Sequence, residues 1–304
     1  MKINKELLKG DILIFLTACL WSLAGVFSKI ANMNPVLLNG LRSLFAVLVT
    51  LIYTKFHVKI NKTIIACGVC MCLTNVTFLI ALSLTTSANA ILLQYTMPIF
   101  VLIESCIYFK RKPTLVQILV LIIAFTGVFI ACSGGITGGG LLGSIIAIGS
   151  GLAFSGVFFL NKMKNASPID STIIGHGLSA LLTLFFIPEL LTLNTTSWLA
   201  AIGMGTLQMG LAYILFSIGI KYCSSFDASL ITMIEVIGMP LLTFIFFNEV
   251  PSIVSLIGGG LIIIAVLINI LTDAKRVQKT PKKIDKILTK WLSKHIWSDI
   301  IKLP

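Results

Sequence analysis

Two segments, LLQYTMPIFVLIESCIYFKRKPT (92–114) and LITMIEVIGMPLLTFIFFNEVPS (230–252), follow one pattern 138 positions apart. Each is an apolar run that carries one acidic residue and ends in Phe, three further residues, Pro and a hydroxyl-bearing residue. The three residues before the Pro differ in charge: the first segment has Lys110-Arg111-Lys112 and the second has Asn248-Glu249-Val250. The chain therefore repeats a segment and reverses the charge at its end.

The composition of the chain indicates a membrane protein. Of its 304 residues, 57% are hydrophobic and 11% are charged, whereas soluble domains average about 25% charged residues. Apolar runs of about 20 residues, each long enough to cross a hydrocarbon layer about 30 Å thick, recur along almost the whole chain. We therefore predict an all-α membrane protein with many spans.

Breaks between the apolar runs predict ten transmembrane spans. Prolines stand at or just before several span starts, where the missing N–H is least costly. The predicted spans are residues 11–31, 35–54, 64–84, 88–109, 114–133, 142–161, 170–190, 198–219, 226–248 and 252–272.

The distribution of positive charge predicts the orientation of the spans. With a cytoplasmic N-terminus, the inside segments hold 21 of the 23 Lys and Arg, nine of them in the tail after residue 273. This asymmetry follows the positive-inside rule, so both termini are predicted to be cytoplasmic and the chain to be multi-pass in the cell (inner or plasma) membrane. The net charge of +12 then reflects the orientation of the spans in the membrane, and no nucleic-acid partner is predicted.

The two halves of the chain match in register. Identical residues recur at an offset of 138 in spans 4 and 9, and at an offset of 133 in spans 1 and 6. Because five spans is an odd number, the second copy must enter the membrane from the opposite face, which explains the charge reversal of the opening segments. The matched pairs include Ser87 and Ser225, Phe109 and Phe247, Pro113 and Pro251, Ser22 and Ser155, and Pro35 and Pro168.

An inverted-topology repeat favours a secondary transporter. Two similar halves of opposite orientation enclose a site near the bilayer midplane, and exchange of their conformations gives alternating access. An intramembrane enzyme and a passive channel are the alternatives. The sequence contains no HExxH, no GxSxG and no nucleotide-binding motif, so we predict no catalytic residues and no cofactor.

The chain resembles the EamA-type transporters of the drug/metabolite transporter superfamily. The resemblance rests on Gly10, ten residues, then Trp21-Ser22, on Lys29 and Arg42, and on ALSLTTSANA (81–90) followed by Pro98. It implies export or exchange of a small metabolite, such as an amino acid or a drug, through a cavity lined chiefly by spans 1, 3, 4, 6, 8 and 9.

Uncharged polar and aromatic residues in those spans are the candidates for lining the cavity. A solute pocket needs a few converging polar groups on an apolar wall, and polar contacts between helices are the alternative role for each residue. With the acid of span 9, the candidates are Trp21, Thr74, Asn75, Gln94, Tyr95, Ser155, Gln208, Tyr213 and Glu235.

Charged residues within spans are costly and usually serve function or pair with a partner. Glu235 lies near the middle of span 9 and is the candidate for proton coupling or for pairing with a substrate amine. Arg42 in span 2 is the candidate for ion pairing. We expect Glu104 to lean toward Lys110 or Arg111, and we expect His176 to be a packing histidine.

Prolines and glycines within the spans predict local helix geometry. Pro98 and Pro240 each remove a helical hydrogen bond, so both are candidate kinks. Gly258-Gly259-Gly260 and the small residues of span 6 are expected to let helices approach closely. The clustered Cys67, Cys70 and Cys72 are interpreted as apolar packing residues, and no metal site is predicted.

The predicted organisation has five parts. A cytoplasmic N-terminus (1–10) precedes the first repeat (11–133), a Gly-rich connector (134–141) and the second repeat (142–272). The tail (273–304) has an apolar helical face opposite a row of lysines, which predicts an interfacial helix on anionic lipid. The expected partners are a small-molecule substrate and the bilayer, with the chain as a monomer or a homodimer.

Overall fold

The computed structural model describes residues 5–133 and 140–279, with side chains through residue 272, and every regular element in this part is helical. Ten helical segments are long and apolar enough to cross a membrane, as predicted. The first begins at Lys5, six residues before its predicted start. The predicted interfacial helix of the tail and most of the predicted connector lie outside the described residues. The spans are, in order, α1 (Lys5–Trp21) with α2 (Ala24–Ala31); α3 (Pro35–Tyr53); α4 (Lys62–Leu84); α5 (Ser87–Gln94) with α6 (Met97–Tyr108); α7 (Leu115–Cys132); α8 (Leu141–Leu160); α9 (Pro168–Ala180) with η2 (Leu181–Phe186) and α10 (Ile187–Leu190); α11 (Thr195–Gly203) with the π-helical η3 (Met204–Leu211) and α12 (Ala212–Gly219); α13 (Ser225–Thr232) with α14 (Glu235–Phe247); and α15 (Ile253–Lys279).

Polar caps set the helix starts. The side chain of Asn34 accepts a hydrogen bond from the backbone N–H of Val36, directly before the first-turn Pro35 of α3. At α7, Thr114 and Gln117 form a reciprocal capping box. Such caps satisfy orphan N–H groups of the first turn, which lipid cannot solvate. The caps end short loops between the spans, and because these loops are short, successive spans run antiparallel.

Two spans are interrupted at matching positions. Span 4 breaks at Tyr95–Thr96, between α5 and α6, and span 9 breaks at Met233–Ile234, between α13 and α14. These breaks are 138 positions apart, the offset of the sequence repeat. Pro98 is the second residue of α6, where its ring suits a helix start, but Pro240 lies inside α14. Proline therefore accounts for the break in span 4 and not for the break in span 9.

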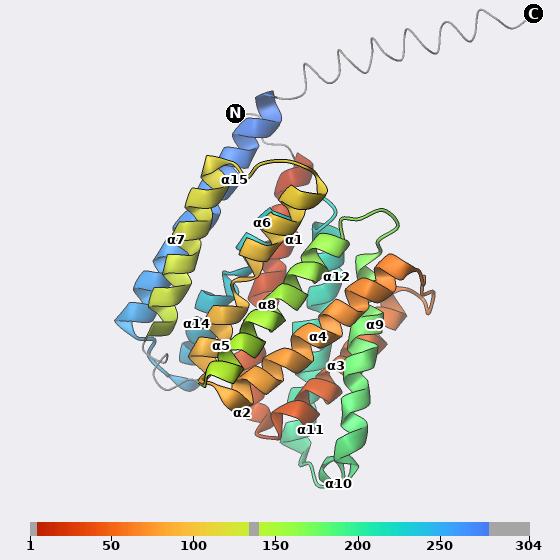
Figure 1. Cartoon of the computed structure of the whole chain (residues 1–304). Coiled ribbons are helices and arrows are strands. Elements are labelled where there is room, and N and C mark those ends of the chain that lie inside the picture. The colour runs from red at the N-terminus through yellow and green to blue at the C-terminus, as the bar shows by residue number, and fades with distance from the viewer. Residues whose placement is uncertain (1–4, 134–139, 280–304) are drawn as a thin grey trace, which may run out of the picture.

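The contacts between helices, like the helix breaks, correspond between the two halves of the chain. Spans 5 and 10 pack together as α7 and α15, side by side along one flank, and spans 2 and 7 pack together as α3 and α9 (Figure 1). The contact of α4 with α8, spans 3 and 6, has its counterpart in the contact of α12 with α1, spans 8 and 1. Exchanging the first five spans with the last five therefore reproduces these helix pairs.

Polar contacts join the loops at the two ends of the bundle. At the proximal end, defined by the loops 54–61, 161–167 and 220–224, the Asn61 side chain donates to the carbonyl of Asn165 at 2.8 Å. At the distal end, where α2 and α14 finish, Lys29 and Glu249 form an ion pair. The distal ends of spans 1 and 9 are therefore linked directly.

Replacing Gly258 with alanine is expected to lower the melting temperature of the protein by several degrees. A Cβ at Gly258 would lie 2.4 Å from the backbone N of Ala131 and from the carbonyl O of Gly127, so α7 and α15 would have to separate. Overpacking of this kind costs about 1–3 kcal/mol. Thermal unfolding in nanodiscs measures the effect.

Gly260 supplies the matched control for that substitution. It lies in the same helix, and a Cβ there would meet nothing within 4 Å, so Gly260→Ala is expected to be neutral or slightly stabilising. Equal melting temperatures for the two variants would contradict the close approach of α7 and α15. Of the three consecutive glycines, Gly258 makes the closest approach to a neighbouring helix and Gly260 makes none.

Candidate functional site

The interrupted helices meet at a partly buried hydrogen bond. Glu235 is the first residue of α14, and Tyr95 is the residue that follows α5. The Tyr95 hydroxyl donates to Oε2 of Glu235 at 2.8 Å. A helix break at membrane depth is tolerated only where protein or a cavity surrounds it. The two breaks therefore place a carboxylate and a phenol together within the bundle.

Arg42 faces the same region from α3. Its Nε and Nη2 atoms donate to Oδ1 of Asn39 at 3.1 and 2.8 Å, which fixes the guanidinium on its own helix. Arg42 interacts electrostatically with Glu235 and Tyr213. Among the described residues, however, the ion pair within 4.0 Å is that of Lys29 and Glu249. Arg42 and Glu235 are therefore neighbours that do not form a direct ion pair.

Aromatic side chains surround these polar groups. The Trp21 ring lies 5.2 Å from Tyr213, 5.9 Å from Phe154 and 6.0 Å from Phe216, measured between ring centroids. His176 stacks edge-on against Tyr213 at 5.0 Å. Such rings offer broad apolar contact with polar edges. Spans 1, 6, 7 and 8 together form an aromatic wall.

Three polar atoms on this wall have no hydrogen-bond partner in the described part of the chain. They are Nε1 of Trp21, Nε2 of His176 and Oε1 of Gln208, whose residues are 4%, 0% and 3% exposed. More than about 90% of buried polar groups in proteins are hydrogen-bonded, and an unsatisfied one costs about 1–3 kcal/mol. The wall therefore presents a buried donor on Trp21, a buried acceptor on Gln208 and a free ring nitrogen on His176, which suit a polar solute.

The EamA-like transporter family model matches the chain twice, over residues 8–133 and 141–271. The chain belongs to the EamA-like transporter family. An uncharacterized transporter of Archaeoglobus fulgidus is 30% identical over 266 residues, covering 85% of this chain and 95% of the relative. An uncharacterized transporter YxxF of Bacillus subtilis (strain 168) is 22% identical over 210 residues, covering 66% of this chain and 67% of the relative.

A solved structure described as "Crystal structure of protein" has the same fold. It superposes with a TM-score of 0.71 at 17% identity, covering 89% of this chain and 99% of that chain. At this identity the likeness concerns the fold alone. Family, relatives and the ten apolar helices together make the chain a multi-pass membrane transporter of small solutes.

Four of the other cavity candidates of this EamA transporter lie in contacts between helices. Gln94 donates to the Ser150 hydroxyl at 2.9 Å, and Ser150 donates to the carbonyl of Thr74 at 3.0 Å. The Asn75 amide lies 3.5 Å from the Ser179 hydroxyl. These bonds tie spans 3, 4, 6 and 7 together, and none of them includes Glu235.

The fourth of these candidates, Ser155, corrects one expectation. Its hydroxyl donates to Oε1 of Glu104 at 2.8 Å. Glu104 was expected to lean toward Lys110 or Arg111, and that expectation was wrong. A hydrogen bond from a hydroxyl on the adjacent α8 stabilises this carboxylate more than an ion pair with cations at the solvated loop would.

His176 was predicted to be a packing residue, and the structure gives it a more specific place. Its Nδ1 lies 3.2 Å from the Ser43 hydroxyl, and its Nε2 faces no partner in the described chain. Ser43 and His176 are 133 positions apart, and so are Trp21 and Phe154, whose rings touch. Two pairs of positions at the sequence offset of 133 are therefore in contact with each other. A search of the sequence for residue pairs at this offset could have identified His176.

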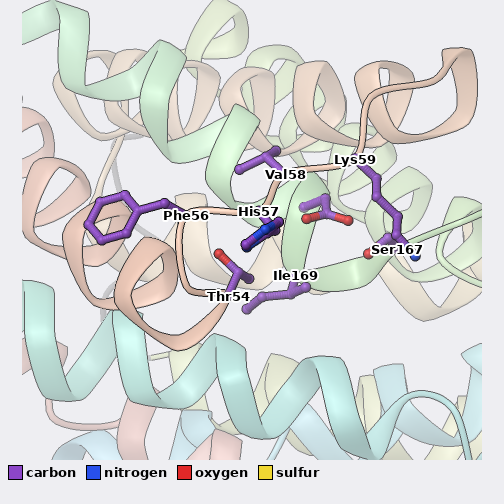
Figure 2. A pocket seen from close by; sticks show the side chains of 8 residues that line it. Thr54, Phe56, His57, Val58, Lys59, Ser167 and Ile169 are labelled. Atoms are coloured by element: carbon purple, nitrogen blue, oxygen red, sulfur yellow. The ribbon is translucent and has the colours of Figure 1, made fainter.

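A surface hollow of about 580 Å³ lies at the proximal end, away from the aromatic wall. Figure 2 shows His57 and Lys59 from the loop after α3 facing Ser167 and Ile169 at the start of α9, with Phe56 turned outward. None of the sequence-predicted site residues lines this hollow. The candidate functional site is therefore the aromatic wall with Glu235 and Arg42.

Proposed function

We propose that this EamA transporter moves a small polar solute by alternating access at the site bounded by Trp21, Arg42, Gln208 and Glu235. The observation that carries the proposal is the set of buried, unpartnered polar atoms on the aromatic wall beside two charged side chains. A solute that supplies the missing hydrogen bonds would bind there and be held near the midplane.

The relation between the halves supports the alternating mechanism. The repeats proposed for residues 11–133 and 142–272 would have opposite orientations in the membrane. The matched helix breaks, the corresponding helix pairs and the contacts of Ser43 with His176 and Trp21 with Phe154 support this arrangement. Rocking of one half against the other would then expose the same side chains to each face in turn.

Charge asymmetry supports the orientation of the transporter. The proximal loops carry Lys55, Lys59, Lys162, Lys164 and Lys221. The positive-inside rule therefore favours a proximal end in the cytoplasm of the cell that holds the protein in its inner or plasma membrane. Export or exchange of a small metabolite is the proposed direction.

Glu235 supports a proton-coupled cycle. It is an acid within the membrane, it accepts a hydrogen bond from Tyr95, and it lies near the cationic Arg42. Intramembrane carboxyl groups commonly serve as proton relays in transporters. Alternate binding of a proton and a solute at Glu235 would link their movements.

Transport in reconstituted vesicles tests the proposal. Mass spectrometry of metabolites in cells lacking and overproducing the protein identifies the solute, and isotope-labelled uptake into proteoliposomes then measures its movement. Unlabelled solute on the far side of the membrane is expected to accelerate labelled uptake, because a carrier returns faster when loaded. Uptake that is indifferent to solute on the far side would indicate a channel and contradict alternating access.

A further inference from the structure

A second group of buried charged residues lies at the proximal ends of spans 1, 9 and 10, apart from Glu235. It contains the carboxylates of Asp11 in α1 and Asp227 in α13, which are 7% and 5% exposed. The proposed transport cycle uses neither residue. Buried carboxylates in a membrane span are costly and need an electrostatic partner.

Asp227 is held by hydrogen bonds on both carboxylate oxygens. Ser224, the residue that caps α13, donates its hydroxyl to Oδ2 at 2.5 Å. The Asn269 amide of α15 donates to Oδ1 at 2.6 Å. These donors stabilise a charged carboxylate and fix its position.

Asp11 has no hydrogen bond in the described part of the chain. The preceding residue, Gly10, packs so closely on the loop before α13 that a Cβ there would lie 2.8 Å from Cβ of Tyr222 and 3.2 Å from the backbone N of Cys223. This approach brings Asp11 beside Asp227, and the two carboxylates repel each other electrostatically. Two neighbouring carboxylates cannot both be ionised without a compensating positive charge.

Lys162 is a cation whose charge interacts with Asp227. Lys162 donates to the carbonyl of Lys221 at 3.3 Å. Burial lowers the pKa of Lys162, and the neighbouring Cys223 and Asp227 oppose that lowering. Burial raises the pKa of the Cys223 thiol, so it stays neutral. Two further lysines lie nearby: Lys221, whose carbonyl accepts from Lys162, and Lys9, which lies over the Tyr222 ring, 5.1 Å from its centroid.

We propose that Asp11 holds a proton beside the hydrogen-bonded Asp227, so that this pair of carboxylates forms a proton-binding site at the proximal ends of spans 1 and 9. The proton removes the electrostatic repulsion between the two carboxylates. A sodium ion would need several oxygen ligands, and both oxygens of Asp227 already accept hydrogen bonds. Loss of the proton places two negative charges between α1 and α13 and favours separation of these helices at the proximal end.

The pH dependence of thermal unfolding of the full chain in nanodiscs tests this site without any solute. The folded protein holds a proton that an unfolded aspartate releases near pH 4, so stability is greatest at low pH and falls as pH rises, until the site itself deprotonates. The wild-type Tm is expected to be about 5 °C higher at pH 5 than at pH 8, measured relative to Asp11→Asn. Asp11→Asn removes this dependence and melts above wild type at pH 8.

Asp170→Asn is the matched control, because Asp170 is a buried aspartate at the proximal start of α9. It is expected to keep the wild-type pH profile. Identical profiles for wild type and Asp11→Asn would overturn the proposal, and so would a Tm increase with sodium over choline at pH 8 that requires Asp11, since that result assigns a sodium site instead.

Lys162→Gln keeps the test decisive if Asp11→Asn fails to fold. Lys162 carries a positive charge that acts on Asp227. Its removal makes the proton of Asp11 harder to release, so the pH at which the Tm levels off is expected to move upward. An unchanged midpoint would overturn the proposal. All three measurements report on the protein itself, so they remain informative even if the proposed solute site is wrong.

Discussion

Replacing Glu235 with glutamine is expected to abolish the solute accumulation that a pH gradient drives, while exchange of solute for solute continues. Glutamine keeps the shape and a hydrogen-bond acceptor for Tyr95 but cannot carry a proton. For one proton per solute, a gradient of one pH unit supports about tenfold accumulation, since 1.4 kcal/mol is a factor of ten. Labelled uptake into proteoliposomes under an imposed gradient should therefore fall from about tenfold to no accumulation.

Two conservative variants are the controls for that result. Tyr95→Phe removes the donor to Glu235 and keeps the carboxyl group, so gradient-driven accumulation is expected to persist. Glu104→Gln removes another acid of the membrane interior, which is bonded to Ser155, and accumulation is again expected to persist. Full accumulation by Glu235→Gln would exclude Glu235 from proton coupling.

Replacing Arg42 with glutamine is expected to lower the rate of transport at low solute concentration by about tenfold to a hundredfold. Asn39 fixes the guanidinium on α3, so its orientation does not depend on the solute. A hydrogen bond to a charged group contributes about 1.5–3 kcal/mol, which corresponds to this range. The ratio of Vmax to KM in proteoliposomes measures the loss.

Arg42→Lys distinguishes charge from geometry at the same position. Lysine keeps the positive charge but lacks the planar fork of donors, so partial recovery is expected. If Arg42→Gln transports the solute with wild-type KM and Vmax, Arg42 does not contact the solute and its role is structural.

The ten spans could be predicted from the sequence because lipid imposes a strict rule. Each span needs about 20 apolar residues, and proline, asparagine and threonine mark the starts, as at Pro35 and Thr114. The start of span 1 was predicted late because Lys5 and Lys9 interrupt the apolar pattern, whereas the helix continues through them to solvent. Long lysine side chains can reach water from such positions.

The geometry of span 9 could not be predicted from residue type. Pro240 remains a candidate kink within the continuous α14, and the interruption of the span lies at Met233–Ile234. Contacts with other helices coincide with that position: Tyr95 bonds Glu235 directly after it, and a Cβ at Gly238 would lie 2.2 Å from the Ser22 hydroxyl. Tertiary packing of this kind carries no local sequence signal.

Only part of the candidate site could be predicted from the sequence, again because contacts between helices leave no local sequence signal. Trp21, Tyr95, Tyr213, Gln208 and Glu235 lie close together, as polar or aromatic residues of the implied cavity spans would. His176 was predicted only as a packing residue, because a single histidine in an apolar run has no periodic pattern. Its contact with Ser43, 133 positions away, becomes visible only when the sequence is searched for pairs at that offset. Thr74, Gln94 and Ser155 have the same residue types but lie between helices, so residue type alone does not separate the two roles.

The opposed orientation of the two halves is the central claim, and accessibility labelling tests it most directly. Cysteines introduced in place of Lys110 and Asn248, in separate variants, are treated with a membrane-impermeant maleimide in intact cells and in inverted vesicles, with the parent chain as background. We expect the cysteine at position 110 to be labelled in inverted vesicles only and the cysteine at position 248 in intact cells only. Labelling of both positions from the same side would contradict the account.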